Sequence, residues 1–162
     1  MIRRLLPVFL LLVTFTFAAQ AQKKTPEQKA TKKAANITKF VNSKITAGAK
    51  VTAAQTAKVK EAYLTFYNDQ KALRTRRKEF RTKLKAFKVK ASKPVSKEEK
   101  VKLQAEQKEL GAEKKAMSKE RKEMVTRREE AIIGALNTVQ QGHFKAMRAE
   151  QAAKRKAKKS QK

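Results

Sequence analysis

The sequence predicts an all-α fold of four helices, in which the second and third form a long antiparallel hairpin. Three observations indicate this fold class. One helix-starting pattern occurs four times, apolar residues recur at steps of seven over long stretches, and no bounded stretch alternates apolar with polar residues as a strand would. We therefore expect helices joined by short connections, and no sheet.

Each expected helix starts with a capping box. In this arrangement a Ser, Thr or Asn side chain accepts a hydrogen bond from the backbone N–H three residues later, and a Glu or Gln at that later position reaches back to the first backbone N–H. Pro26 directly follows the first box, where its missing N–H costs nothing. The four pairs are Thr25 with Gln28, Thr52 with Gln55, Ser96 with Glu99, and Asn137 with Gln140.

Stop signals set the expected helix lengths. Gly48 can supply a left-handed cap after the first helix. Pro94 ends the second, because proline lacks an N–H and restricts Lys93 before it. We expect helices over residues 26–46, 53–89, 97–135 and 138–157. The expected domains are a helical domain over residues 22–153 and a basic, disordered tail over residues 154–162.

Apolar stripes on the second and third helices predict that the two pack together. The stripe of the second helix comprises Val59, Tyr63, Phe66, Leu73, Phe80, Leu84 and Phe87. The stripe of the third comprises Leu103, Leu110, Met117 and Met124. A seven-residue repeat is typical of helices that pack along their length, and the short connection favours an antiparallel hairpin. Because the core is thin, we expect a second copy to complete a homodimer.

The first 22 residues carry the order of features that is typical of a secretory signal peptide. Arg3 and Arg4 give a positive start, residues 5–17 form an apolar run, and Ala19 and Ala21 supply small residues at a cleavage site. We expect cleavage after Ala21 and a periplasmic protein. An uncleaved membrane anchor is the alternative, but the apolar run is shorter than the roughly 20 residues that a spanning helix needs. Without cysteine, the chain can carry neither a lipid-modified cysteine nor a disulfide.

The mature chain is strongly basic. Cleavage after Ala21 removes two of the 42 basic residues and none of the 14 acidic ones, which leaves a net charge of +26. The many Lys and Arg side chains repel one another, and together they attract polyanions and acidic protein surfaces. The composition therefore favours a binding role in which charge matters.

Two of the four boxes share a longer pattern. Residues 51–55 read Val-Thr-Ala-Ala-Gln and residues 136–140 read Leu-Asn-Thr-Val-Gln, with the charged hairpin between them. The pair resembles the repeated L-T-x-x-Q motif of the Spy/CpxP family of periplasmic proteins, and the resemblance covers residues 25–151. Val51 stands for Leu and Asn137 for Thr, which keeps an apolar residue and a capping side chain in those places.

This resemblance implies both an architecture and an activity. The architecture is a curved, cradle-shaped homodimer of four-helix subunits. The activity is ATP-independent binding of unfolded or partly folded client proteins.

The sequence offers little for catalysis or metal binding. His143 is the only histidine and there is no cysteine, so Ser-His and Cys-His nucleophilic constellations are unsupported. Some members of the wider family bind metals through histidines, and one His without Cys cannot form such a site alone. Met117 and Met124 continue the seven-residue stripe and are interpreted as core. We expect no enzymatic activity, no metal and no cofactor.

The second helix carries a candidate client-binding surface. Its second half is rich in Lys and Arg with Glu79 as the only acid, whereas the third helix mixes both signs. Basic side chains beside apolar ones suit long-range attraction followed by loose apolar contact. The alternative is a solvated face whose apolar stripe is entirely used by the hairpin. The candidate residues are Arg74, Arg77, Phe80, Arg81, Leu84, Phe87 and Lys88.

These features favour a chaperone-like protein whose partners are unfolded or partly folded envelope proteins. A binder of lipopolysaccharide or another envelope polyanion, or a structural protein of the envelope, is the first alternative. A regulatory partner in envelope stress is the second. We do not expect nucleic acid as a partner, because an exported protein rarely meets it, although the basic tail resembles a nucleic-acid-binding arm.

Overall fold

The computed structural model describes residues 24–94 and 96–160, and in this part of the chain every regular element is a helix. The elements are α1 (Pro26–Asn42), the short 3-10 helix η1 (Ala47–Ala49), α2 (Ala53–Ala91), α3 (Lys97–Ala135) and α4 (Thr138–Ser160). The prediction of an all-α fold with four α-helices is confirmed. The expected signal peptide, residues 1–21, lies outside the described residues.

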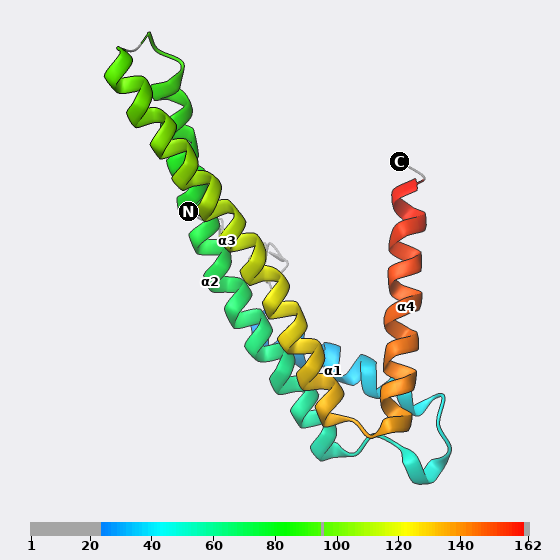
Figure 1. Cartoon of the computed structure of the whole chain (residues 1–162). Coiled ribbons are helices and arrows are strands. Elements are labelled where there is room, and N and C mark those ends of the chain that lie inside the picture. Colours follow the sequence, from blue (N-terminus) through cyan, green and yellow to red (C-terminus); the bar gives the residue numbers. More distant parts are fainter. Residues whose placement is uncertain (1–23, 95, 161–162) are drawn as a thin grey trace, which may run out of the picture.

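The helices form two arms on a common base. α2 and α3 lie side by side over most of their length and make the longer arm (Figure 1). α1 packs against α2 near the base of this arm, and α4 rises from the same base and diverges from it (Figure 1). From Ala149 onward every described side chain of α4 is exposed. A search of the described helices for a stretch long and apolar enough to cross a membrane finds none.

Every α-helix starts with both hydrogen bonds of its capping box. In the Thr25 and Thr52 boxes the threonine Oγ1 accepts a hydrogen bond from the glutamine N–H at 3.2 Å. The corresponding distances are 3.3 Å for Ser96 with Glu99 and 2.9 Å for Asn137 with Gln140. In each box the Gln or Glu side chain accepts the return bond at 2.9–3.1 Å. These bonds satisfy backbone donors that a helix start otherwise leaves without partners.

The two longer motifs meet at the base. Gln140 is fully buried, with 0% of its surface exposed. Its Nε2 donates to the carbonyl oxygen of Ala49 at 2.9 Å and to Oε1 of Gln55 at 3.3 Å. The same Gln55 oxygen accepts from the backbone N–H of Thr52. One network of hydrogen bonds therefore joins η1 to the starts of α2 and α4.

α1 is shorter than the sequence predicted, because it ends at Asn42 instead of near residue 46. The Asn42 side chain accepts a hydrogen bond from the Val51 N–H at 2.7 Å, and Ser43 is the C-cap residue in a right-handed conformation. The prediction of a left-handed cap at Gly48 is wrong, since no glycine among the described residues has a positive φ. A side-chain bond to a distant backbone group holds this connection instead.

α4 is longer than the sequence predicted. Residues 154–160, expected to belong to a disordered tail, continue the helix. Lys, Arg and Ala favour helices, and cations near a helix C-terminus interact favourably with its dipole. Lys154 also pairs with Glu150 one turn earlier at 2.6 Å, and this hydrogen bond holds the pKa of the Glu150 carboxyl below its ordinary value.

Two separate clusters of apolar side chains stabilise the base and the long arm. The base cluster comprises Ala30, Ala34, Ile37, Val41, Val51, Val59, Tyr63, Ile132, Ala135, Leu136, Phe144 and Met147. The arm cluster comprises Leu73, Phe80, Leu110, Met117 and Met124, with Phe66, Leu84 and Phe87 packed against it. The arm cluster consists of residues from the two predicted stripes, so the seven-residue pattern identified the α2–α3 contact.

Candidate binding surface

A ladder of ion pairs lies along one side of the α2–α3 pair. Its four rungs are Asp69–Arg127 at 3.5 Å, Arg76–Glu120 at 2.8 Å, Lys83–Glu113 at 3.2 Å and Lys90–Glu106 at 3.4 Å. Successive rungs are seven residues apart in both helices, so they share one side of each. We call this side the ladder flank.

Most other acids of the two helices also lie on the ladder flank. A helix turns by about 100° per residue, which places each side chain relative to the buried stripe. By this geometry the further acids on the ladder flank are Glu61, Glu79, Glu98, Glu109, Glu123 and Glu130. Glu99, seven residues before Glu106, lies on this flank as well, and the exception is Glu129 at the base. The opposite side of the arm is therefore almost free of negative charge.

That opposite side is basic on both helices, and we call it the basic flank. It carries Lys71, Arg74, Arg77, Lys78, Arg81, Lys85 and Lys88 on α2, and Lys100, Lys114, Lys115, Arg121 and Lys122 on α3. Among the described residues, none of these side chains has a carboxylate within 4.0 Å. Arg77 is half-buried, and the other side chains named here are exposed. The basic flank thus offers positive charge that the fold leaves uncompensated.

The structure separates the charged and apolar members of the candidate surface. Arg74, Arg77, Arg81 and Lys88 all lie on the basic flank. Phe80 is buried in the arm cluster, and Leu84 and Phe87 are half-buried against it. The arginines and Lys88 are therefore gathered on one face, whereas most of the apolar surface is used between the helices.

Arg128 closes the lower end of the basic flank, where the arm meets the base. Its guanidinium carbon lies 4.5 Å from the ring centroid of Phe66 and 5.3 Å from that of Tyr63, within the range of cation–π attraction. The side chain is 11% exposed, and its buried Nε has no hydrogen-bond partner among the described residues. Arg128 thus brings a positive charge into a mostly apolar place.

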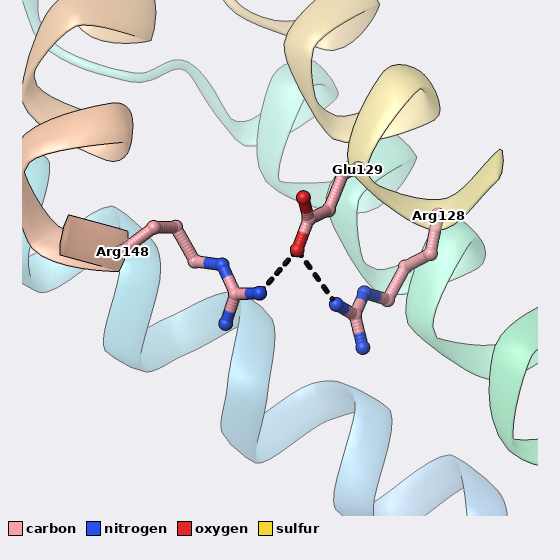
Figure 2. A network of polar contacts seen from close by, with 3 residues as sticks. All are labelled: Arg128, Glu129 and Arg148. Carbon is pink, nitrogen blue, oxygen red and sulfur yellow. Dashed lines mark hydrogen bonds and ion pairs between the residues drawn. The ribbon is translucent and has the colours of Figure 1, made fainter. Parts of the chain in front are cut away.

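Glu129 links the arm to α4. Its Oε1 accepts from Nη2 of Arg128 at 3.1 Å and also pairs with Arg148 of α4 (Figure 2). One carboxylate therefore serves two guanidiniums, which leaves this cluster with a net positive charge.

Two tyrosines border the same cluster. Burial raises the pKa of the Tyr63 hydroxyl above its ordinary 10.0, although the charges of Arg128 and Arg148 oppose the change. Burial also raises the pKa of Tyr67. Both hydroxyls are therefore neutral at physiological pH, and they add no negative charge to the basic flank.

The contribution of α3 was not singled out from the sequence. Lys100, Lys114, Arg121 and Arg128 lie at multiples of seven residues from one another, which is the spacing of the core stripe. Basic residues with that spacing must share one side of the helix. The signal was present in the sequence, but the mixed composition of α3 hid it.

Two further hollows lie outside the basic flank in the described part of the chain. A groove of about 480 Å³ near the base is lined by Ala62, Phe66, Ala131 and Gly134 and by charged residues of both signs. A hollow of about 440 Å³ lies at the tip of the arm, beside Pro94 and the exposed Val89. Within the described ranges no three His, Cys, Asp or Glu side chains gather as a metal site would require.

Comparisons with protein-family models, with curated proteins and with solved structures find no match to this chain.

Proposed function

We propose that this chain is an exported, ATP-independent binding protein of the periplasm that holds unfolded or partly folded proteins at its basic flank. The observation that carries the proposal is the segregation of charge on the long arm. Carboxylates neutralise Arg76, Lys83 and Lys90 on one side, and none stands within 4.0 Å of the described basic-flank residues on the other. The choice of unfolded or partly folded proteins as clients is supported by the resemblance of residues 51–55 and 136–140 to the repeated motif of Spy/CpxP proteins.

The long arm is an antiparallel hairpin in this proposal. The partner residues in the ladder support it, because Glu120, Glu113 and Glu106 follow one another in descending order as Arg76, Lys83 and Lys90 ascend. A second copy would complete a homodimeric cradle. The small arm cluster and the groove at the base leave apolar surface that a second copy could cover. Light scattering of the purified protein measures the molar mass and so tests whether it is a dimer.

Client capture in this scheme begins with charge. A run from Arg74 to Lys88 spans about 21 Å at 1.5 Å per residue, long enough to meet several acidic side chains of an extended chain. Uncompensated charge raises the rate of encounter more than the strength of the final contact. The half-buried Leu84 and Phe87 leave a narrow apolar margin. Loose contact of that kind allows release without ATP.

Binding of an envelope polyanion is the second candidate function. It is favoured by the burial of Phe80 and by the positions of the large apolar side chains that are exposed in the described residues. These are Val89, Val101 and Val139, and none lies among the arginines of the basic flank. A surface with charge but little apolar area suits an anionic polymer such as lipopolysaccharide.

One experiment decides between the two functions. The purified protein is added, without ATP, to a model client that aggregates on dilution from denaturant, and it is titrated in parallel with lipopolysaccharide at two salt concentrations. The proposal predicts that client aggregation is suppressed. Tight lipopolysaccharide binding whose logarithm falls linearly with log salt, together with unchanged client aggregation, would replace the proposed function by polyanion binding.

A further inference from the structure

A hollow of about 170 Å³ lies on the basic flank, close to the base of the long arm. Three arginines line it, Arg74 and Arg77 from α2 and Arg121 from α3. Its remaining walls are formed by Gln70 and by the apolar side chains of Phe66, Leu73 and Met124. Arginines from two helices thus line one hollow together with apolar side chains.

The donors in this hollow outnumber the acceptors. Each guanidinium has five N–H donors and no acceptor. Arg74 uses one donor on Oε1 of Gln70 at 3.3 Å, which orients its side chain toward the hollow. Among the described residues no carboxylate lies within 4.0 Å of Arg74, Arg77 or Arg121. Arg128 packs on Phe66 just below and adds a further buried donor without a partner.

The ladder flank shows that this lack of carboxylates is local. Arg76 is next to Arg77 in sequence, yet Arg76 pairs with Glu120 at 2.8 Å. Arg127 follows Arg121 by six residues on α3, and it pairs with Asp69 at 3.5 Å. The same two helices therefore supply a carboxylate to each arginine on one side and to none of the three that line the hollow. Like charges held close together repel, and an anion from solution would relieve that repulsion.

We propose that the hollow binds a phosphate group, either free or carried as a phosphate ester. Guanidinium forks donate paired hydrogen bonds that match the oxygens of a phosphate. A volume of about 170 Å³ corresponds to roughly five or six waters at about 30 Å³ each, enough for one such group. The apolar side chains of Phe66, Leu73 and Met124 lower the local polarity, which strengthens the attraction. The proposal rests on the proposed function only in that both use the basic flank.

Inorganic pyrophosphate is the probe, and titration calorimetry of the purified protein is the measurement. The double variant R77Q/R121Q removes two arginines of the hollow, and R76Q/R127Q removes the same charge from the neighbouring positions of the ladder flank. We expect R77Q/R121Q to weaken pyrophosphate binding by about tenfold or more, because charge-assisted hydrogen bonds are lost. R76Q/R127Q should stay within about twofold of the unaltered protein. Equal weakening in both variants, or no binding by the unaltered protein, would overturn the proposal.

Two further measurements separate loss of phosphate binding from loss of folding, and free phosphate from lipid-borne phosphate. Arg77 is half-buried, so Arg74→Gln, at an exposed position, is a second variant that should weaken binding without affecting the fold. Lipopolysaccharide before and after removal of its phosphates separates the sources. Loss of affinity on dephosphorylation in the unaltered protein but not in R77Q/R121Q assigns a lipid-borne phosphate, whereas pyrophosphate binding alone assigns free phosphate.

Client binding is measured in the same variants and in R81Q/K88Q, which changes the basic flank outside the hollow. If phosphate binding fails while R81Q/K88Q still impairs client capture, the hollow is rejected and the proposed function stands. If client capture fails in every protein while the pyrophosphate contrast holds, the phosphate site stands alone.

Discussion

Gln140 donates a hydrogen bond from its buried Nε2 to Oε1 of Gln55 at 3.3 Å, and this bond joins the starts of two helices that are 85 residues apart in sequence. Each glutamine also completes the capping box of its own helix. The two motif copies are therefore one structural unit at the base. α2 and α4 begin at this unit, and α3 ends next to it at Ala135. The unit therefore sets the positions from which the long arm and α4 diverge.

Gln140→Ala should be strongly destabilising. The substitution leaves the Ala49 carbonyl and the Asn137 N–H without the part-buried hydrogen bonds that Gln140 makes to them, and a lost partner of this kind costs about 1–3 kcal/mol. We expect the free energy of unfolding in urea to fall by about 2–4 kcal/mol. Gln28→Ala is the matched control, because Gln28 fills the same place in an exposed capping box and should cost about 1 kcal/mol or less. Similar losses in the two variants would contradict the importance of the buried network.

The ion-pair ladder should respond to charge reversal in a pairwise manner. Glu113→Lys places a second cation beside Lys83 and should lower the free energy of unfolding by about 0.5–1 kcal/mol at low salt. Adding Lys83→Glu restores an opposite pair, so the double variant should recover most of that loss. A urea-unfolding double-mutant cycle measures the coupling, which should shrink at high salt. Additive effects of the two substitutions would show that the rung contributes nothing.

The raised pKa of Tyr63 predicts that the free energy of unfolding falls as the pH rises above 10. Burial raises its pKa in the folded protein above the ordinary 10.0, so the unfolded chain gives up this proton first. The contribution of Tyr63 is fully present below pH 10 and is lost as pH rises from 10 through the raised pKa. Tyr63→Phe should therefore reduce the steepness with which the free energy of unfolding falls above pH 10. Comparing the two proteins at each pH removes the effect of the lysines, which titrate in both; identical slopes would contradict the assignment.

Local signals predicted much of the fold. The capping boxes identified all four helix starts because the bonds lie within three residues, and the stripe containing Leu110, Met117 and Met124 identified the α2–α3 contact. The end of α1 depends on a bond between the Asn42 side chain and the Val51 N–H, a tertiary contact that no local pattern contains. The end of α4 was misjudged because a basic composition was interpreted as disorder, although Lys, Arg and Ala favour helices.

The candidate surface was predictable in part. The sequence placed Arg77, Arg81 and Lys88 together with Phe80, Leu84 and Phe87, and the structure separates the two sets. The separation follows from how α2 turns its stripe toward α3, which depends on both helices. The same turn brings Glu120 to Arg76 and leaves Arg77 without a carboxylate within 4.0 Å. Adjacent residues thus differ in role because of a rotation that composition does not reveal.

The rate at which the protein captures an unfolded client tests the central claim, that the uncompensated basic flank does the binding. R77Q/R81Q/K88Q removes three charges from this flank, and R76Q/K83Q/K90Q removes three from the ladder flank of the same helix. Stopped-flow capture of a fluorescent client is measured at low salt and at 0.1 M, where screening acts beyond about 10 Å. We predict that the first variant slows capture severalfold, most at low salt, whereas the second changes it little. Equal slowing by both variants, or none by the first, would contradict the account.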